Sequence, residues 1–270
     1  MRAPCIKAVG LLSGWGPGAA AVPPDALAAA GGRAVLAVPR PALDPDRFRR
    51  SRRECLMGVA AVSAMLEDAG EGPEAIAGER TALLYATVAA YAPSNREFIE
   101  ARGGSVYFPY TAGAAVPAET AIAFGLTGPY EILLGGAPAT LRAIARAATL
   151  LETGACDRAL VLAVEVFEEC ADLFAQARSA FGKPLVEAAA CVWLEPGEGT
   201  LTFEQRRGRG SVAGGRLRLG EMLACEPLAA LALARESAEA GPTRVTGSWR
   251  GETARLEWSG SAYRTRPRAA

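Results

Sequence analysis

A strand, a helix and a second strand in the middle of the chain place the tightest limit on its fold. Residues 131–134 are a brief apolar strand, residues 139–152 form an Ala-rich helix that ends before Gly154, and residues 159–166 are continuously apolar. A run of this kind is typical of a strand that is buried on both faces of a sheet. The segment therefore predicts a sheet covered by helices.

The flanking segments continue this alternation. Strands are expected at 6–12 and 81–86, and a helix is expected at 46–69, where apolar residues recur at three- and four-residue steps before Gly70. A shorter stretch of helical spacing follows at 118–124. Helices and strands that alternate in this way predict a layered α/β domain.

Paired strands are expected toward the C-terminus. Residues 188–194 and 200–205 resemble two strands that Pro196 and Gly197 would join as a hairpin, and residues 244–249 and 254–259 resemble a closing pair. We interpret residues 1–270 as one domain, because half of the residues are apolar and a chain of this size buries one substantial core.

Charge gives little indication of a charged partner. The 29 Lys and Arg residues equal the 29 Asp and Glu residues, so neither nucleic acid nor an anionic membrane is expected as a partner. A basic run at 47–53 is interpreted as a solvated helix start, with an acidic partner or a phosphate as the alternative.

The cysteines and the missing histidines limit the chemistry further. The six cysteines are widely spaced and the chain has no histidine, so neither a metal nor a cofactor is expected. The cysteines are expected to be buried hydrophobic residues in a reducing compartment. No apolar run approaches the roughly 18 residues that span a bilayer, and no secretion signal is visible. A cytoplasmic location is therefore expected.

The stretch from Gly128 to Leu141 reads GPYEILLGGAPATL, and Gly154-x-x-Asp157 and Glu165 follow it. This stretch resembles the condensing enzymes of the β-ketoacyl synthase family. The shared features, in the same order and at the same spacing, are a Gly-Pro pair, a short strand, a tight turn, a long helix and an acid after the next strand. Ala137 stands where those enzymes carry the reactive cysteine. Residues 186–195 and 249–256 resemble the family's Gly-Glu-Gly-Ala strand and its closing strand pair.

This resemblance implies a thiolase-like fold with layers of the α-β-α-β-α type. It also implies a complete N-terminal half, residues 1–198, and a shortened C-terminal half, residues 199–270, from which the family's catalytic histidines are missing. Condensation needs a thiolate and side chains that carry protons. With Ala137 at the nucleophile position we expect no catalytic residue, and the chain is not expected to be an enzyme by itself.

Family members that lack the cysteine and pair with an active ketosynthase are the chain-length factors, which shape a tunnel for the growing polyketide. The resemblance therefore implies a non-catalytic subunit of a type II polyketide synthase, an acyltransferase complex of the β-ketoacyl synthase kind. Its partner would be a ketosynthase subunit, bound as a heterodimer through a large apolar interface. The acyl carrier protein would be an indirect partner. The short C-terminal half suggests reduced or polyene products.

In the family, the residues that face the tunnel precede the Gly-Pro pair. Carried over, they are Phe108, Tyr110, Thr111, Ala112, Ala115 and Val116. The small side chains among them would leave space for a long, straight chain, or would instead only allow close packing of the backbone at the interface.

The sequence is also compatible with other functions. One is a stand-alone pseudo-ketosynthase with a structural or regulatory role. Another is an enzyme that acts on thioesters, although no serine stands in a Gly-x-Ser-x-Gly pattern. A third is nucleotide binding at Gly14-x-Gly16-x-x-Ala19, which Pro17 and the pair Pro23-Pro24 argue against because they interrupt the helix that should begin there.

Overall fold

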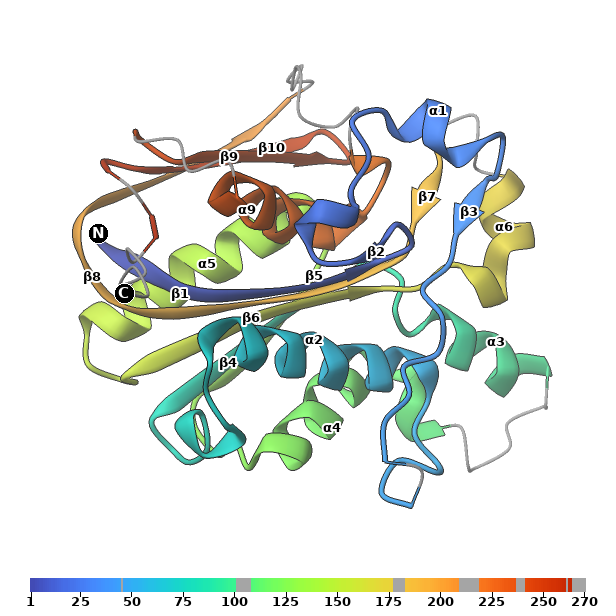
Figure 1. Ribbon diagram of the computed structural model, residues 1–270, viewed down its shortest axis with the longest axis horizontal. Helices are drawn as coiled ribbons and strands as arrows, with labels where there is room; N and C mark the ends of the chain where they lie inside the picture. The colour runs from blue at the N-terminus through green and yellow to red at the C-terminus, as the bar shows by residue number, and fades with distance from the viewer. Residues whose placement is uncertain are drawn as a thin grey trace.

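A single mixed sheet runs through the computed structural model, which describes residues 1–44, 46–100, 108–176, 183–208, 219–236, 241–260 and 262–263. Its central order is β2-β1-β8-β6-β4-β5, and the β9–β10 hairpin extends it by pairing β10 with β8 (Figure 1). The strands are β1 (Arg2–Ser13), β2 (Gly16–Pro17), β4 (Thr81–Thr87), β5 (Tyr130–Leu134), β6 (Arg158–Glu165), β8 (Ala188–Arg207), β9 (Arg244–Trp249) and β10 (Glu252–Trp258). β4 lies parallel to β5 and β6, whereas β8 is antiparallel to β6 and β1.

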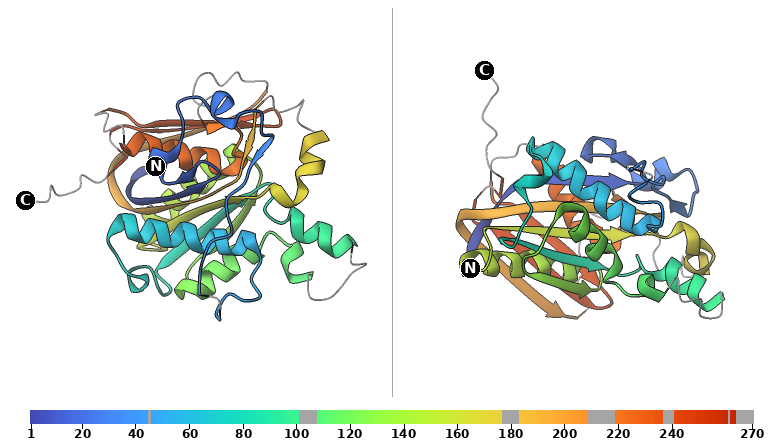
Figure 2. Two further views of the ribbon diagram at one scale, coloured as in Figure 1. Left: turned by 45° about the vertical axis from the view of Figure 1, so that its right-hand side comes forward. Right: turned by 90° about the horizontal axis from the view of Figure 1, so that it is seen from below.

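Helices cover both faces of this sheet. α5 and α9 pack on one face and α2 and α4 on the other, while β9 and β10 lie beyond α5 and α9 (Figures 1 and 2). The helices are α1 (Ala26–Ala30), α2 (Arg53–Ala69), α3 (Ala92–Glu100), α4 (Ala115–Phe124), α5 (Ala137–Glu152), α6 (Ala171–Gln176) and α9 (Glu226–Glu236). A separate two-stranded parallel sheet joins β3 (Val35–Leu36) to β7 (Leu185–Val186). The predicted layered α/β fold is confirmed.

One predicted hairpin is wrong. Residues 188–207 form the single strand β8, which bends from the central sheet toward β10 instead of turning at Pro196 and Gly197 (Figure 1). A Cβ atom on Gly197 would lie 2.7 Å from the backbone nitrogen of Cys5. The glycine therefore permits close approach of β1 and does not form a turn. The predicted boundary at residue 198 falls inside this strand.

The start of the predicted helix at 46–69 is also corrected. α2 begins at Arg53, because the preceding residue Arg52 has extended backbone angles. Upstream, the Asp44 side chain accepts a hydrogen bond from the Asp46 backbone at 3.0 Å, which stabilises a local turn in place of a helix. The end at Gly70 is confirmed, with φ at +68° in the left-handed region.

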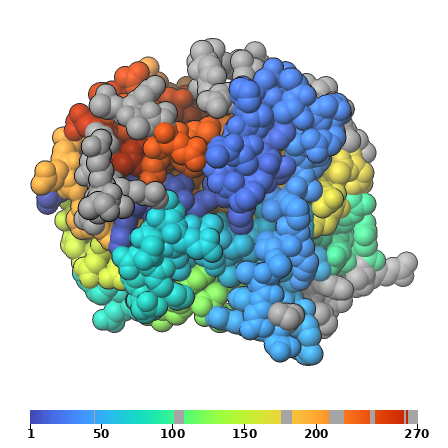
Figure 3. Space-filling view, viewed as in Figure 1, coloured from blue at the N-terminus to red at the C-terminus, as the bar shows by residue number. Residues whose placement is uncertain are grey.

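The N- and C-terminal parts pack against each other. α9 lies against β1 and the short 3-10 helix at Ala19–Ala21, and the two regions form adjoining blue and orange surfaces in Figure 3. Arg235 of α9 donates to the backbone oxygen of Lys7 at 3.0 Å and pairs with Asp68 of α2. Five of the six cysteines are buried, and all six are free thiols. Among the described residues, no helix is both long and apolar enough to cross a bilayer.

Candidate functional site

The tight turn predicted between β5 and α5 is present, and it places Ala137 at the first position of α5. Gly135 has φ at +150°, a conformation that favours glycine, and its backbone nitrogen donates to Thr87 of β4 at 2.9 Å. Gly136 is the N-cap residue. The Ala137 side chain is only 1% exposed. The turn between β5 and α5 thus presents a buried methyl group at the first position of the helix.

Strand β9 lies directly over this turn. A Cβ atom on Gly247 would lie 2.4 Å from the Cβ of Ala137, so the two backbones are in close contact. A Cβ atom on Gly136 would lie 2.7 Å from Cγ of the Trp249 indole. The space above the turn is therefore occupied by β9 and its aromatic side chain.

An apolar cluster surrounds the same region. Its buried members are Ala89, Phe167, Leu185 and Leu223, and Trp249 packs against them. Leu223, in the 3-10 helix Leu223–Cys225, has φ at +49°, an uncommon angle for a residue with a side chain. This helix lies in residues 199–270, the half from which the resemblance implies that the family's catalytic histidines are missing.

The Glu165 side chain connects the N-terminal and C-terminal parts of the chain. Its fully buried carboxyl group accepts hydrogen bonds from the backbone nitrogens of Val88 at 2.7 Å, Ala89 at 2.8 Å and Ala224 at 3.3 Å. Burial raises the pKa of Glu165 to about 8, although these hydrogen bonds act in the opposite direction. Glu165, which was singled out in the sequence as a family position, thus connects β4 to the 3-10 helix.

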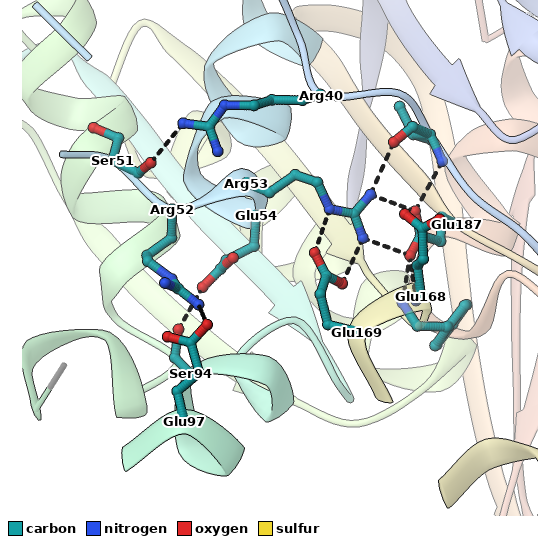
Figure 4. A network of polar contacts seen from close by, with 12 residues as sticks. Arg40, Ser51, Arg52, Arg53, Glu54, Ser94, Glu97, Glu168, Glu169 and Glu187 are labelled. Carbon is teal, nitrogen blue, oxygen red and sulfur yellow. Dashed lines mark hydrogen bonds and ion pairs between the residues drawn. The ribbon is translucent and has the colours of Figure 1, made fainter. Parts of the chain in front are cut away.

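A second buried carboxylate, Glu187, is bound by Arg53 (Figure 4). Arg53 Nη1 and Nη2 lie 2.6 and 2.7 Å from the two carboxylate oxygens of Glu187, and the same guanidinium pairs with Glu169. Burial by itself would lower the pKa of Arg53, but the hydrogen bonds to Glu187 and Glu169 raise it above its usual value. Glu187 also accepts hydrogen bonds from the backbone nitrogens of Val38, Phe167 and Glu168.

Most arginines of the basic run at 47–53 form ion pairs or hydrogen bonds with other residues of the chain. Arg52 pairs with Glu97 at 2.7 Å, and Arg47 donates to the backbone oxygen of Ala123 at 2.8 Å. Arg49 and Arg50 are exposed. The interpretation as a solvated helix start did not anticipate the Arg53 network, because Glu187 lies 134 residues away in the sequence.

The six predicted tunnel residues lie in the 3-10 helix Phe108–Thr111, at Ala112 in the link that follows it, and at the start of α4. Ala112 is exposed, Phe108 is 64% exposed, and Tyr110, Thr111 and Ala115 are half-buried. Val116 is buried and faces α2, where a Cβ atom on Gly58 would lie 2.8 Å from its Cγ1. Five of the six thus reach the surface, and Val116 packs into the core.

β5 forms an edge of the sheet that sequence reasoning had not identified as exposed. Among the described residues it pairs only with β4, and its end residues Tyr130 and Leu134 are 45% and 62% exposed. Ile122 of α4 is 73% exposed. A free edge strand that carries exposed apolar side chains at both ends is a surface to which another chain can add.

The possible nucleotide-binding motif lacks its structural context. Gly16 belongs to the two-residue strand β2, and the next helical element is the three-residue 3-10 helix Ala19–Ala21. A Cβ atom on Gly14 would lie 2.3 Å from the backbone oxygen of Leu36, so this glycine permits chain packing. The helix N-terminus that would hold a pyrophosphate is not formed there.

Comparison with known proteins gives a family match and a set of structures with the same fold. Residues 40–183 match the family model described as "Beta-ketoacyl synthase, N-terminal domain". No curated protein sequence matches the chain.

A chain of the ishigamide ketosynthase/chain length factor is 18% identical with a TM-score of 0.75, and the match covers 96% of this chain and 99% of that one. A chain of AntDE:AntF, a type II PKS acyl-carrier protein in complex with its ketosynthase bound to the hexaketide, is 12% identical with a TM-score of 0.78 and the same coverage. The ketosynthase ApeO in complex with its chain length factor ApeC, from Xenorhabdus doucetiae, gives 14% identity and a TM-score of 0.56 over 81% of this chain and 82% of that chain. At these identities the likeness concerns the fold.

Proposed function

The chain belongs to the β-ketoacyl synthase family, and we propose that within it this protein is a non-catalytic chain-length factor. It would pair with an active ketosynthase and shape the acyl tunnel during polyketide elongation. The observation that carries the proposal is Ala137, a methyl group buried at the nucleophile turn of a chain without histidine. The fold is retained, whereas the thiolate and the imidazoles that condensation requires are missing.

The β5 edge supports a partner subunit. Leu83 donates to Pro129 and Gly135 donates to Thr87, so alternate residues of β5 turn their backbone groups toward β4. The N–H groups of Tyr130, Ile132 and Leu134 then point to the free edge. A partner strand would satisfy these groups and cover the exposed side chains of Tyr130 and Leu134.

The solved relatives support the kind of partner. Two of them are a ketosynthase together with a chain length factor, and a third is an acyl-carrier protein with its ketosynthase. We propose a ketosynthase as the direct partner of this chain and the acyl carrier protein as an indirect one. Reduced or polyene products are proposed from the short C-terminal half alone.

We propose that the predicted residues line the tunnel because of where they lie. Five of the predicted residues, Phe108, Tyr110, Thr111, Ala112 and Ala115, reach the surface before and at the start of α4, and a Cβ atom on Gly113 would lie 3.2 Å from the Leu134 side chain. Their segment therefore adjoins the free edge. Val116, being buried, would support this segment from beneath.

Co-expression with a ketosynthase of a type II polyketide synthase tests the proposal. We expect the two chains to copurify as a one-to-one complex, measured by size-exclusion chromatography with light scattering. Condensation activity should require the cysteine of the ketosynthase and should be unaffected by Ala137→Gly. A well-folded monomer that does not bind the ketosynthase would overturn the proposal and favour the stand-alone pseudo-ketosynthase.

A further inference from the structure

We propose that Trp249 is a built-in plug that keeps acyl chains out of this subunit's own half-site. The inference rests on the proposed function, since it concerns a subunit that must leave elongation to its partner. Loss of the nucleophile at Ala137 prevents covalent loading but does not by itself prevent an acyl chain from entering. The plug would supply that second barrier.

The indole covers the glycine that precedes Ala137 at the turn. A Cβ atom on Gly136 would lie 2.7 Å from Cγ and 2.9 Å from Cδ2 of Trp249, so the ring is in contact with the N-cap residue of α5. Trp249 also packs against the apolar cluster that contains Ala89, Phe167 and Leu223. An apolar surface that would suit an acyl chain is thereby already covered by the protein's own side chain.

The hairpin that carries Trp249 holds it firmly in place. Arg250 and Gly251 have φ values of +47° and +79°, which is the pattern of a type I′ turn, and they pair Trp249 with Glu252 across the strands. Glu252 in turn accepts a hydrogen bond from Arg142 of α5 at 2.6 Å. The strand that carries the plug is thus tied to the helix that carries the turn.

The backbone of β9 strengthens the seal. Gly247 approaches so closely that its own Cβ atom would lie 2.4 Å from the Cβ of Ala137. Above the ring, the Arg250 guanidinium lies 5.4 Å from the indole centroid, within the range of a cation–π contact. Movement of Trp249 away from Gly136 would therefore also break its contacts with the apolar cluster and with Arg250.

Thiol labelling of the full chain tests the plug without a partner. An Ala137→Cys substitution introduces a thiol next to Gly136, the residue that Trp249 contacts, and iodoacetamide labelling at that position is followed by peptide mass spectrometry. Cys191 is fully buried in β8 and serves as an internal control for unfolding in the same sample. We expect labelling of the introduced thiol to be as slow as that of Cys191, and to become at least about tenfold faster when Trp249→Ala is added.

Two results would overturn the plug. One is rapid labelling in Ala137→Cys alone while Cys191 stays protected, because a plug displaced by one sulfur atom cannot exclude an acyl chain. The other is equally slow labelling after Trp249 is removed. If Trp249→Ala also exposes Cys191, Trp249→Leu is judged by the same two criteria. A failed plug would leave copurification with a ketosynthase intact, so the two proposals fail separately.

Discussion

Arg53 binds both carboxylate oxygens of Glu187, at 2.6 and 2.7 Å, where the Glu187 side chain is completely buried. The pair connects the first turn of α2 to the residue that precedes β8 (Figure 4). Through its other hydrogen bonds, Glu187 also holds the backbone of Val38 and Phe167. This ion pair thus links α2 to the backbone at Val38 and at Phe167, a member of the apolar cluster.

Removing the arginine should therefore be costly. Arg53→Met keeps an apolar stem but leaves Glu187 buried without a cation, and we expect the free energy of unfolding to fall by about 3–5 kcal/mol. Urea denaturation measures the change. Arg80→Met is the matched control, because Arg80 and Asp157 form an exposed pair, and it should leave the midpoint unchanged. Equal effects of the two substitutions would contradict a structural role for Arg53.

Glu165 should make stability depend on pH. The unfolded chain releases this proton near pH 4.5, whereas the folded chain keeps it up to about pH 8. Folding then becomes less favourable as pH rises between these values, by roughly 1 kcal/mol per pH unit from this group, and levels off above them. The Glu165→Gln variant lacks this slope, so urea denaturation should show its stability gaining on that of the wild type as pH rises. A difference in stability between the two proteins that stays constant with pH would show that Glu165 does not titrate in this range. The control is Glu198→Gln, at an exposed position.

The β5 edge can be blocked with a single backbone change. Ile132→Pro removes an N–H group that points away from β4, so the isolated chain should still fold. The complex with the ketosynthase should nevertheless be lost in size-exclusion chromatography. Ile132→Ala is the control, because it removes a similar side chain but keeps the N–H group, and it should retain the complex. Copurification of both variants would place the interface elsewhere.

The small residues before β5 should affect product length. Ala112→Phe or Ala115→Phe places a large ring on the segment next to the free edge, and we expect shorter polyketides from the reconstituted complex, identified by mass spectrometry. Ala28→Phe on α1 adds the same ring at an exposed position and should leave chain length unchanged. Products of unaltered length from both Ala112→Phe and Ala115→Phe would assign these residues to backbone packing only.

Local pattern predicted the centre of the fold well. The turn at Gly135 and Gly136, the helix after it and the buried strand β6 all follow from glycine placement and apolar spacing, which act within a few residues. The closing pair β9 and β10 was predicted for the same reason. The family position of Ala137 came from spacing alone, and the structure places it at the expected turn.

Long-range contacts account for what was missed. Pro196 and Gly197 have the composition of a turn, but pairing with β1 keeps β8 extended through them. Arg53 appeared to be one of several surface arginines, because its carboxylate partner is distant in sequence. Trp249 resembled an ordinary strand residue, and only the approach of β9 to α5 places it over Gly136.

The continuity of β8 bears on how such a protein can be divided. Residues 188–200 pair with β1 and β6, and residues 201–207 pair with β10, so one strand supplies hydrogen bonds to both parts of the chain. Splitting the gene between codons 198 and 199 would leave each fragment with half of a strand and an unpaired sheet edge. The two halves are therefore not interchangeable modules, and separately expressed fragments should not assemble as the intact chain does.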